Sequence, residues 1–396
     1  MFLVRILRKI GLVSACISAC MPGASMPVAA APDIPGEYKQ VNAGTTSSVR
    51  NEWVDNTKFQ DRGQQRYWTY SFSPPHADSR YARVRFDQIR VPPGLAFSIR
   101  VVQLPSEAKV AYIPGETFAA SDAFVTDLLP AGDLRIELVS NARPDGLSFR
   151  LERLLWRSTP PLAVPESPVF TYKNVQSLPA AHPALQAAPS IALLHVVPTD
   201  VTCTGALIDS KTVITNYHCV QYSLSFLQTE QDAHPSCGDI IAEFDYLTKN
   251  QRGVSSKCVA IRADKTLDAA LITLDPAKIQ LPSGMDRPPI AIRPAADGPP
   301  DAVALLQHPL GLPMSLYDSC SNKGIEGTDI LHDCLSSSGS SGSPLLDQQM
   351  RFAGLHYKGA YPDEWTIIQM NADFIQNGPR FNRARSSATV SGFLNP

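Results

Sequence analysis

Short runs of alternating apolar and polar residues are the sequence feature that most limits the fold of this 396-residue chain. In its first half, apolar residues recur at every second position in four runs, which lie at 82–86, 97–101, 134–138 and 147–151. A period of two is typical of β-strands with one buried face, and turn sequences rich in proline and glycine separate the runs. Long windows show no helical periodicity. The pattern predicts an all-β protein in which residues 66–157 form a small antiparallel β-sandwich.

Changes in composition divide the rest of the chain. Residues 31–65 are polar with few apolar anchors, and we expect a poorly ordered lead-in. Residues 158–189 are rich in proline and alanine, which favours an extended linker that a protease can reach. Residues 190–396 again consist of short strand-like runs and loops, and their length fits two β-barrels.

The first 30 residues have the pattern of an export signal. Basic residues at the start are followed by an apolar run at 10–19 and by small residues at 28–30 that offer a cleavage site. The apolar run is too short to span a bilayer. A second interpretation is a lipobox at 17–20, in which Cys20 would carry lipid. The protein is therefore expected to be secreted or periplasmic, or else to be a lipid-anchored envelope protein.

Cysteine usage agrees with export. Two of the eight cysteines lie in the signal region, and the other six all lie in the second half of the chain. An even number in an oxidising compartment predicts three disulfides, with a few unpaired buried thiols as the alternative. No Cys-X-X-Cys spacing occurs, so we expect no metal site and no cofactor. The six are Cys203, Cys219, Cys237, Cys258, Cys320 and Cys334.

The net charge of the chain argues against binding of a partner through charge alone. The formal net charge is −2 at pH 7, and such a balance provides no field that would attract nucleic acid or a membrane surface. Membrane association is expected only if Cys20 is lipidated. The function must therefore be inferred from individual sites.

A glycine- and serine-rich run, GSSGSP at 339–344, has the features of a nucleophile turn. A serine hydroxyl needs a nearby base and hydrogen-bond donors for the oxyanion that forms during attack on an acyl carbon. Gly339 and Gly342 permit backbone conformations that most residues avoid and leave room for a substrate. In such a turn the N–H groups of Gly339 and Ser341 can point at one spot, which predicts an oxyanion hole. The alternative is a flexible linker.

Two upstream residues can complete this chemistry. His218 ends an apolar strand beside Cys219, which can pair with Cys203, and a disulfide there would fix the position of a base. Asp268 opens the apolar run AALITL, and a buried carboxylate at that point needs a hydrogen-bonded partner such as a histidine N–H. Because a lone histidine is usually structural, the inference depends on all three residues together.

The order His218, Asp268, Ser341 and the motifs around them resemble the trypsin/chymotrypsin-like serine peptidases. The motifs are CTGALI, TNYHC, DAALI and GSSGSP. They look closest to the bacterial V8-like branch, which contains glutamyl and lysyl endopeptidases. The resemblance covers residues from about 190 to the end and implies a double β-barrel. It also implies a catalytic triad in which Ser341 attacks the scissile carbonyl, His218 moves the proton and Asp268 orients His218.

The N-terminal part resembles, less specifically, the precursor region of lysyl endopeptidase-like proteins. This implies a zymogen whose β-sandwich is a propeptide, although a substrate-docking module that is kept for life remains the alternative. Trypsin has an aspartate directly before its nucleophile, and this chain has Ser340 there. The activation switch of trypsin is therefore absent, and we expect maturation through a cut in the linker.

The expected substrate pocket also departs from trypsin. Leu335 stands where trypsin-like members keep an aspartate, so a basic P1 side chain would find no carboxylate. Ser336 and His356 fall where glutamyl endopeptidases receive an acidic side chain, and Lys358 lies nearby. The resemblance thus implies an acidic P1 preference, against the simpler interpretation that His356 is a packed strand residue.

Taken together, these features predict an exported, monomeric serine endopeptidase that acts on proteins or peptides. The competing hypothesis is a catalytically inactive binding protein built on a protease fold.

Overall fold

The computed structural model describes residues 45–394 except 75–76, 78, 128, 131, 158–171, 197–200, 222–236, 249–251 and 360–380. All of them belong to the unit Asn42–Pro396, which is separate from the unit Met1–Val41. The expected signal segment and lipobox lie outside the described residues. Within the described part of the chain, no helix is long and apolar enough to cross a membrane.

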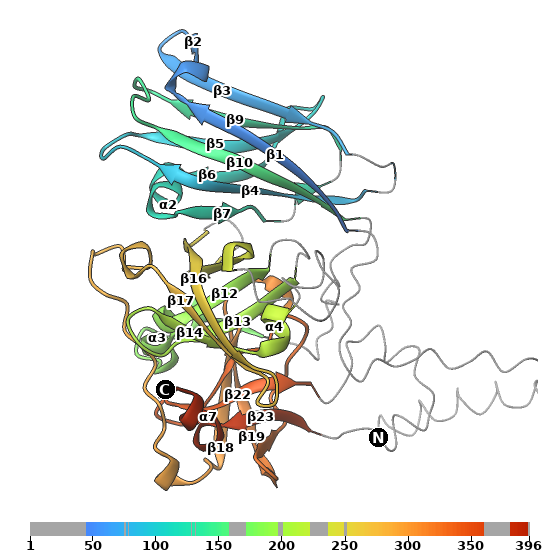
Figure 1. Ribbon diagram of the computed structural model, residues 1–396, viewed down its shortest axis with the longest axis vertical. Helices are drawn as coiled ribbons and strands as arrows, with labels where there is room; N and C mark the ends of the chain where they lie inside the picture. Colours follow the sequence, from blue (N-terminus) through green and yellow to red (C-terminus); the bar gives the residue numbers. More distant parts are fainter. Residues whose placement is uncertain are drawn as a thin grey trace, which may run out of the picture. The chain divides into compact units, whose positions relative to one another are not determined.

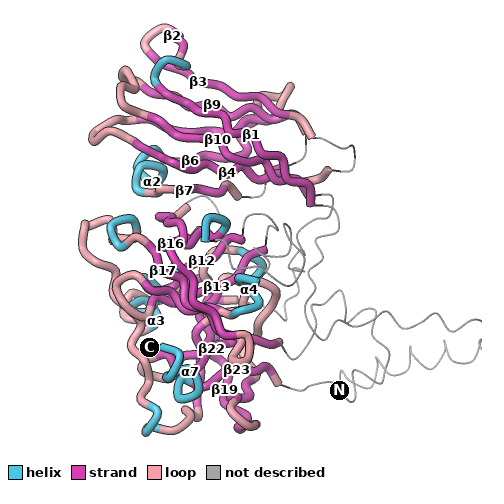
Figure 2. The backbone as a smooth tube through the Cα atoms, in the orientation of Figure 1, coloured by secondary structure: helices cyan, strands magenta, loops and turns pink. Residues whose placement is uncertain are grey.

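Antiparallel strands dominate the structure (Figure 2). The first ten strands form two sheets packed as a β-sandwich, as predicted (Figure 1). One sheet has the order β1 (Thr45–Asp55), β10 (Ser148–Arg157), β4 (Tyr81–Arg90) and β7 (Ala123–Val125), with β8 (Leu129–Pro130) also paired to β4. The other has the order β2 (Gln60–Arg62), β3 (Gln65–Phe72), β9 (Leu134–Ser140), β5 (Phe97–Gln103) and β6 (Ala108–Pro114). Two short helices, η1 (Asn56–Lys58) and α2 (Gly115–Ala120), connect strands.

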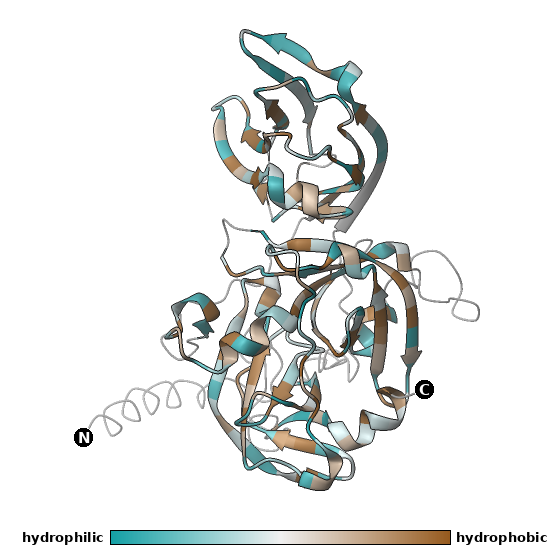
Figure 3. Ribbon diagram, turned by 90° about the vertical axis from the view of Figure 1, so that its left-hand side faces the viewer, coloured by the Kyte–Doolittle hydropathy of each residue, from teal (hydrophilic) through white to brown (hydrophobic). Residues whose placement is uncertain are grey.

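The sandwich core is formed by the inward face of each alternating run. Aromatic side chains fill much of it: the ring of Trp68 meets that of Phe149 edge-on at 5.4 Å, and Phe118 meets Phe149 at 5.5 Å. Trp156 is 1% exposed. These residues serve packing, and Figure 3 shows apolar residues distributed along the strands.

The prediction of a poorly ordered lead-in at 31–65 was wrong from residue 45 onward. β1 pairs with β10 from Thr45↔Arg157 to Asp55↔Ser148. It is an edge strand, and backbone hydrogen bonds can hold an edge strand whose sequence is mostly polar. A prediction from hydropathy alone therefore missed this strand.

The second half of the chain forms two closed six-stranded barrels, as predicted. The first consists of β12 (Ile191–Val196), β13 (Val201–Leu207), β14 (Thr212–Thr215), β17 (Ala269–Leu274), β16 (Val254–Asp264) and β15 (Ile240–Phe244). The second consists of β18 (Ala302–Gln307), β19 (Ser315–Glu326), β20 (Asp329–His332), β23 (Asn382–Ser386), β22 (Phe352–Lys358) and β21 (Pro344–Leu346). A shared apolar cluster joins them, with Ile214 and Leu271 from the first and Leu306 and Leu355 from the second.

Short helices lie between these strands, and α7 follows β23. They are η2 (Val175–Ser177), α3 (Ala184–Ala187), η3 (Ala188–Ser190), α4 (Tyr217–Gln221), η5 (Cys237–Asp239), η6 (Pro276–Lys278), η7 (Ala295–Asp297), η8 (Pro309–Gly311) and α7 (Ser387–Leu394).

The predicted linker at 158–189 is too long at its C-terminal end. β11 (Lys173–Asn174) pairs with β19, and the side chains of Val175, Ala184 and Ala187 are buried in the cluster shared by the barrels. The alanine content of this segment favoured a linker, but these small side chains instead pack closely in the cluster between the barrels. The remaining part of the linker, 158–171, lies outside the described residues.

Three disulfides are present, in the number predicted from the cysteine count. They join Cys203 to Cys219, Cys237 to Cys258 and Cys320 to Cys334. The first two belong to the first barrel and the third to the second barrel.

Candidate active site

His218 and Asp268 lie in direct contact. His218 is in α4, directly after β14, and Asp268 immediately precedes β17, which pairs with β14. The His218 Nδ1 atom lies 2.8 Å from Asp268 Oδ2, and the His218 backbone N–H donates to Asp268 Oδ1 at 2.9 Å. One carboxylate therefore holds both the ring and the backbone of the histidine, which fixes its orientation.

The backbone of Asp268 is itself constrained. Its φ is +49°, a left-handed conformation that aspartate and asparagine tolerate better than most residues. Its carbonyl accepts a hydrogen bond of 2.9 Å from the side-chain amide of Asn216, which is fully buried. Sequence reasoning overlooked Asn216, although it lies two residues before His218 in the TNYHC motif.

The two other aspartates of this region have different roles. Asp264 accepts hydrogen bonds from the backbone N–H groups of Thr266 and Leu267, at 2.8 and 3.0 Å. Asp275 caps η6 by accepting from the Ala277 N–H at 3.0 Å. Both carboxylates thus stabilise turns.

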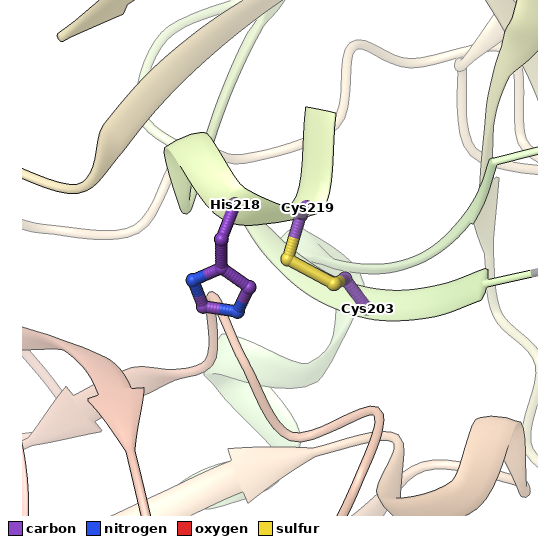
Figure 4. A group of neighbouring side chains, drawn as sticks. All are labelled: Cys203, His218 and Cys219. Carbon is purple, nitrogen blue, oxygen red and sulfur yellow. A yellow bond between two sulfur atoms is a disulfide. The ribbon is translucent and has the colours of Figure 1, made fainter. Parts of the chain in front are cut away.

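The disulfide between Cys203 and Cys219 lies beside His218 (Figure 4). Ligand atoms of these three residues lie within 4.8 Å of one another. The two sulfurs are bonded to each other and so are not thiolates, the form in which cysteine binds a metal. The cluster therefore serves to anchor α4 to β13.

Ser341 lies against this same anchor. Its backbone carbonyl accepts a hydrogen bond of 2.8 Å from the Thr204 N–H, and Cys219 Sγ lies 3.9 Å from that carbonyl oxygen. Within the described part of the chain, no hydrogen bond joins the Ser341 hydroxyl to His218. Catalytic hydrogen bonds are often long in structures without substrate and shorten when substrate binds.

The turn before Ser341 is oriented by the HPLG segment at 308–311. The carbonyl of Ser338 accepts a hydrogen bond from the Leu310 N–H. In a planar trans peptide the C=O and N–H point in opposite directions, so the Gly339 N–H points away from Leu310. Neither the Gly339 N–H nor the Ser341 N–H has an acceptor among the described residues. Two N–H groups two residues apart are thus left for a ligand.

Thr204 on β13 connects the two barrels at this turn. Its hydroxyl donates to the Gly339 carbonyl at 2.9 Å and accepts from the His308 N–H at 2.9 Å. His308 is fully buried, and burial lowers the pKa of its ring to about 4 against the opposing effect of a hydrogen bond to the Leu312 carbonyl. Neither residue was assigned a site role from sequence, because hydrogen bonds between residues so far apart leave no local pattern.

Ser340 is fully buried and satisfied locally. Its hydroxyl accepts a hydrogen bond of 3.1 Å from the Ser337 N–H, and its carbonyl accepts one of 3.1 Å from the Ser343 N–H. Ser340 therefore stabilises the turn itself.

Gly342 is required by its surroundings. Its φ is +83°, and a Cβ atom there would lie 2.1 Å from the Thr204 carbonyl oxygen and 2.2 Å from Thr215 Oγ1. Both atoms belong to the first barrel, so any side chain at this position would push the two barrels apart.

Gly342→Ala should therefore destabilise the protein by about 3 kcal/mol or more, from left-handed strain and overpacking. For an unfolding unit of the size of residues 190–396, the melting temperature should fall by roughly 6–12 °C. Gly392→Ala is the matched control, because Gly392 lies in α7 with no atom within 4 Å of the new Cβ. A melting temperature of Gly342→Ala within about 2 °C of the wild type would contradict the prediction.

The residues expected in the substrate pocket are only partly brought together. His356 on β22 is 2% exposed, and its Nδ1 atom lies 3.2 Å from Nε2 of His332 on β20, which is fully buried. Leu335 and Ser336 are half-buried, and the Leu335 carbonyl accepts a hydrogen bond of 2.9 Å from Gln307 Nε2. No hydrogen bond joins Ser336 to His356 in the described segments. Lys358 is exposed at the end of β22.

Burial governs the charge of this histidine pair. It lowers the pKa of His356 well below its usual value, with smaller contributions in the same direction from His332 and His218. Burial also lowers the pKa of His332 to about 3. Both rings are therefore neutral at pH 7.

One family model and several solved structures resemble part of this chain. Residues 203–355 match the family model of the trypsin-like peptidase domain. The search of curated proteins finds no match. Among solved structures, the Rv3671c protease in its inactive form is 15% identical, with a TM-score of 0.36 over 54% of this chain and 90% of that chain. The active form of Rv3671c protease from M. tuberculosis is 16% identical, with a TM-score of 0.37 over 54% and 82%. The serine endoprotease from Yersinia pestis is 16% identical, with a TM-score of 0.38 over 54% and 64%.

The family match and the two closed barrels lead to one conclusion. The segment that contains residues 203–355 is similar to the trypsin-like peptidase domain and lies in the two closed barrels, and a β-sandwich precedes it.

Proposed function

We propose that this protein is an exported serine endopeptidase that cleaves peptide bonds through a covalent acyl-enzyme. The observation that carries the proposal is the double hydrogen bond between His218 and Asp268, with the Ser341 backbone held beside the disulfide that anchors His218. Such an arrangement of base, orienting acid and serine is the requirement for an activated hydroxyl.

In the proposed reaction the Ser341 hydroxyl oxygen attacks the scissile carbonyl carbon and gives its proton to His218 Nε2. The Nδ1 side of the ring is held by Asp268, which stabilises the imidazolium that forms. The Gly339 and Ser341 N–H groups receive the negative charge of the tetrahedral oxyanion. His218 then protonates the leaving amine, and water hydrolyses the acyl-enzyme by the same steps.

The competing function is an inactive binding protein on the same fold. A fluorophosphonate probe separates the two hypotheses, because it reacts with an activated serine and leaves an ordinary one unmodified. We expect one covalent adduct, at Ser341. An intact protein that remains unlabelled at Ser341 would favour the binding protein.

Export and maturation are supported by the basic and apolar start of the sequence and by three disulfides in the peptidase domain. Because Ser340 offers no carboxylate to a newly formed N-terminus, we propose that maturation uses a cut between the sandwich and the barrels, at 158–171. Mass spectrometry of the exported protein reports the mature N-terminus, any lipid on Cys20 and any such cut.

An acidic P1 preference is supported by the pairing of the neutral His332 and His356 rings, because that pairing selects one tautomer.

 One of the two facing nitrogens, His332 Nε2 or His356 Nδ1, must donate the hydrogen bond. His332 Nδ1 is buried without a partner, and a buried nitrogen without a proton costs less there than an unpaired N–H. His332 Nε2 is therefore the donor, and His356 carries its proton on Nε2. That N–H is the proposed donor to an acidic P1 side chain, and the Ser336 hydroxyl is a second proposed donor.

His356→Phe tests the pocket. A peptide library should show enrichment of Glu and Asp at P1 with the wild type, and kcat/KM for P1 Glu should fall roughly 10- to 100-fold in the variant, because a hydrogen bond to a charged group is lost. Cleavage after apolar P1 residues should change less than about threefold. Lys358→Gln is the control, since Lys358 is exposed. A library profile without acidic enrichment would refute the pocket but leave the peptidase proposal intact.

A further inference from the structure

In the described part of the first barrel, which is closed, the start of β16 extends beyond its pairing with β17. β16 pairs with β15 over Val254–Lys257 on one side, but its pairing with β17 on the other side begins only at Cys258. The outer backbone groups of residues 254–257 thus have no barrel strand beside them in the described part of the chain. An uncovered edge of this kind is a site where another segment can pair.

A segment of the sandwich covers this edge. Within the unit Asn42–Pro396, the Ser255 N–H donates to Ser121 Oγ at 3.1 Å, and the Ser255 carbonyl accepts from the Asp122 N–H at 3.3 Å. The Lys257 N–H donates to Asp122 Oδ1 at 2.9 Å. Ser255 is 1% exposed. Removing the sandwich would leave these backbone groups without their partners.

Buried ion pairs add to the backbone contacts. Lys257 Nζ lies 2.9 Å from Asp87 Oδ2 on β4, and Arg150 on β10 donates to both oxygens of the same carboxylate at 2.7 Å. Asp87 is 2% exposed. Burial by itself would raise the pKa of Asp87, but the bonds from Arg150 and Lys257 outweigh it and lower the pKa. The carboxylate is therefore charged, and Lys257 is one of its two cationic partners.

Arg252 forms a second buried link. It is 5% exposed and donates to Glu243 at 2.8 Å and to Asp127, which follows β7 in the sandwich. Its guanidinium carbon lies 4.5 Å from the ring centroid of Tyr246, whose hydroxyl donates to Asp127 at 3.1 Å. Asp127 thus provides an acceptor for two barrel side chains. Loss of Asp127 would remove one acidic partner of Arg252 and the acceptor of the Tyr246 hydroxyl, while Glu243 would still pair with Arg252.

An apolar cluster completes this docking surface. Ala123, Val125 and Leu155 of the sandwich pack with Ile241 of β15, and none of the four is more than 2% exposed. The surface therefore combines an apolar centre with paired backbone groups and paired charges, which is the composition of a stable interface.

We propose that this surface keeps the sandwich bound to the first barrel after the chain is cut between residues 158 and 171. The mature protein is then a complex of two fragments, and the sandwich is a permanent structural partner. No hydrogen bond or ion pair in the described residues joins the sandwich to His218, Asp268 or Ser341. A sandwich that stays bound therefore need not block the proposed active site. The inference rests on the maturation cut proposed above, but it does not depend on peptidase activity.

In the test, the full chain is cut, and we then determine whether the two fragments dissociate. A recognition site for a sequence-specific protease is placed within 158–171 of the Ser341→Ala variant, so that only the added protease cleaves. After complete cleavage, size-exclusion chromatography at about 1 µM should give one peak that contains both fragments. Fragments that elute separately in their folded state would overturn the proposal. Because the readout is mass, the outcome is the same whether or not the protein is a peptidase.

Single substitutions then test the assigned surface. Asp127→Ala and Lys257→Ala should each weaken fragment association at least about 10-fold, which corresponds to loss of a hydrogen bond to a charged group. Asp145→Ala is the control, since Asp145 is an exposed sandwich residue that pairs with Arg143 and Asn56. Thermal melting of the uncut variants separates weakened docking from unfolding. If both interface variants stay within about twofold of the control, another surface holds the fragments and the assignment is wrong.

Discussion

Ser341→Ala should lower kcat for peptide hydrolysis by about a million-fold, with a melting temperature close to that of the wild type. The hydroxyl is the proposed nucleophile, and without it no acyl-enzyme forms. The backbone of the turn is held by other groups, since the Ser341 carbonyl bonds to Thr204 and Gly342 bonds to the His356 carbonyl. Removal of one hydroxyl therefore leaves the fold unchanged.

The control for this prediction is Ser391→Ala. Ser391 lies in α7, where its hydroxyl donates to the Ala388 carbonyl at 2.7 Å, and its loss should leave kcat within about twofold, since no proposed chemistry involves it. Initial rates with a fluorogenic peptide and circular dichroism of each purified variant provide the two readouts. Retention of cleavage by a Ser341→Ala preparation free of other peptidases would show that the nucleophile is elsewhere.

Asp268→Asn should lower kcat by about 10,000-fold near neutral pH. Asparagine tolerates the left-handed φ of +49° at this position, and its carbonyl oxygen can still accept the His218 backbone N–H. The amide NH₂ would then face His218 Nδ1 and donate to it. The ring proton would move to Nε2, and His218 could no longer take a proton from Ser341.

Asp264→Asn is the matched control for this substitution. Asp264 lies four residues earlier, and its single accepting oxygen, Oδ1, which caps the turn, is preserved in asparagine. We expect kcat within about threefold of the wild type, because no charge near His218 is removed. Equal losses in the two variants would mean that Asp268 acts only through loop structure and would contradict its orienting role.

Much of the fold follows from local patterns. The alternating runs predicted the strands of the sandwich, and the number of cysteines outside the signal region predicted three disulfides. The patterns failed where a segment takes its structure from a distant partner. β1 is polar but pairs along the whole of β10, and Ala184, Ala187 and Ala188 are buried in the cluster shared by the barrels.

The candidate site shows the same division. His218 and Asp268 lie in recognisable motifs, and they are in contact as expected. Thr204, Asn216 and His308 carry no comparable signal, yet their hydrogen bonds connect the nucleophile turn and the Asp268 loop to the first barrel. The pairing of His332 with His356 was also not predicted, because the two rings come together only when β20, β23 and β22 are placed side by side.

The sequence by itself determined the alternating strands β4, β5, β9 and β10 and which residues are capable of acyl-transfer chemistry, because periodicity, turn residues and side-chain type are local properties. Only the tertiary structure decided which polar groups find partners. Whether Asp127 meets Arg252, whether Asp122 covers the edge of β16 and whether the Gly339 N–H is left open depend on chain segments far apart in sequence. These pairings affect stability because the groups are buried. A polar group removed from water without a partner costs free energy, and a local sequence pattern does not show this cost.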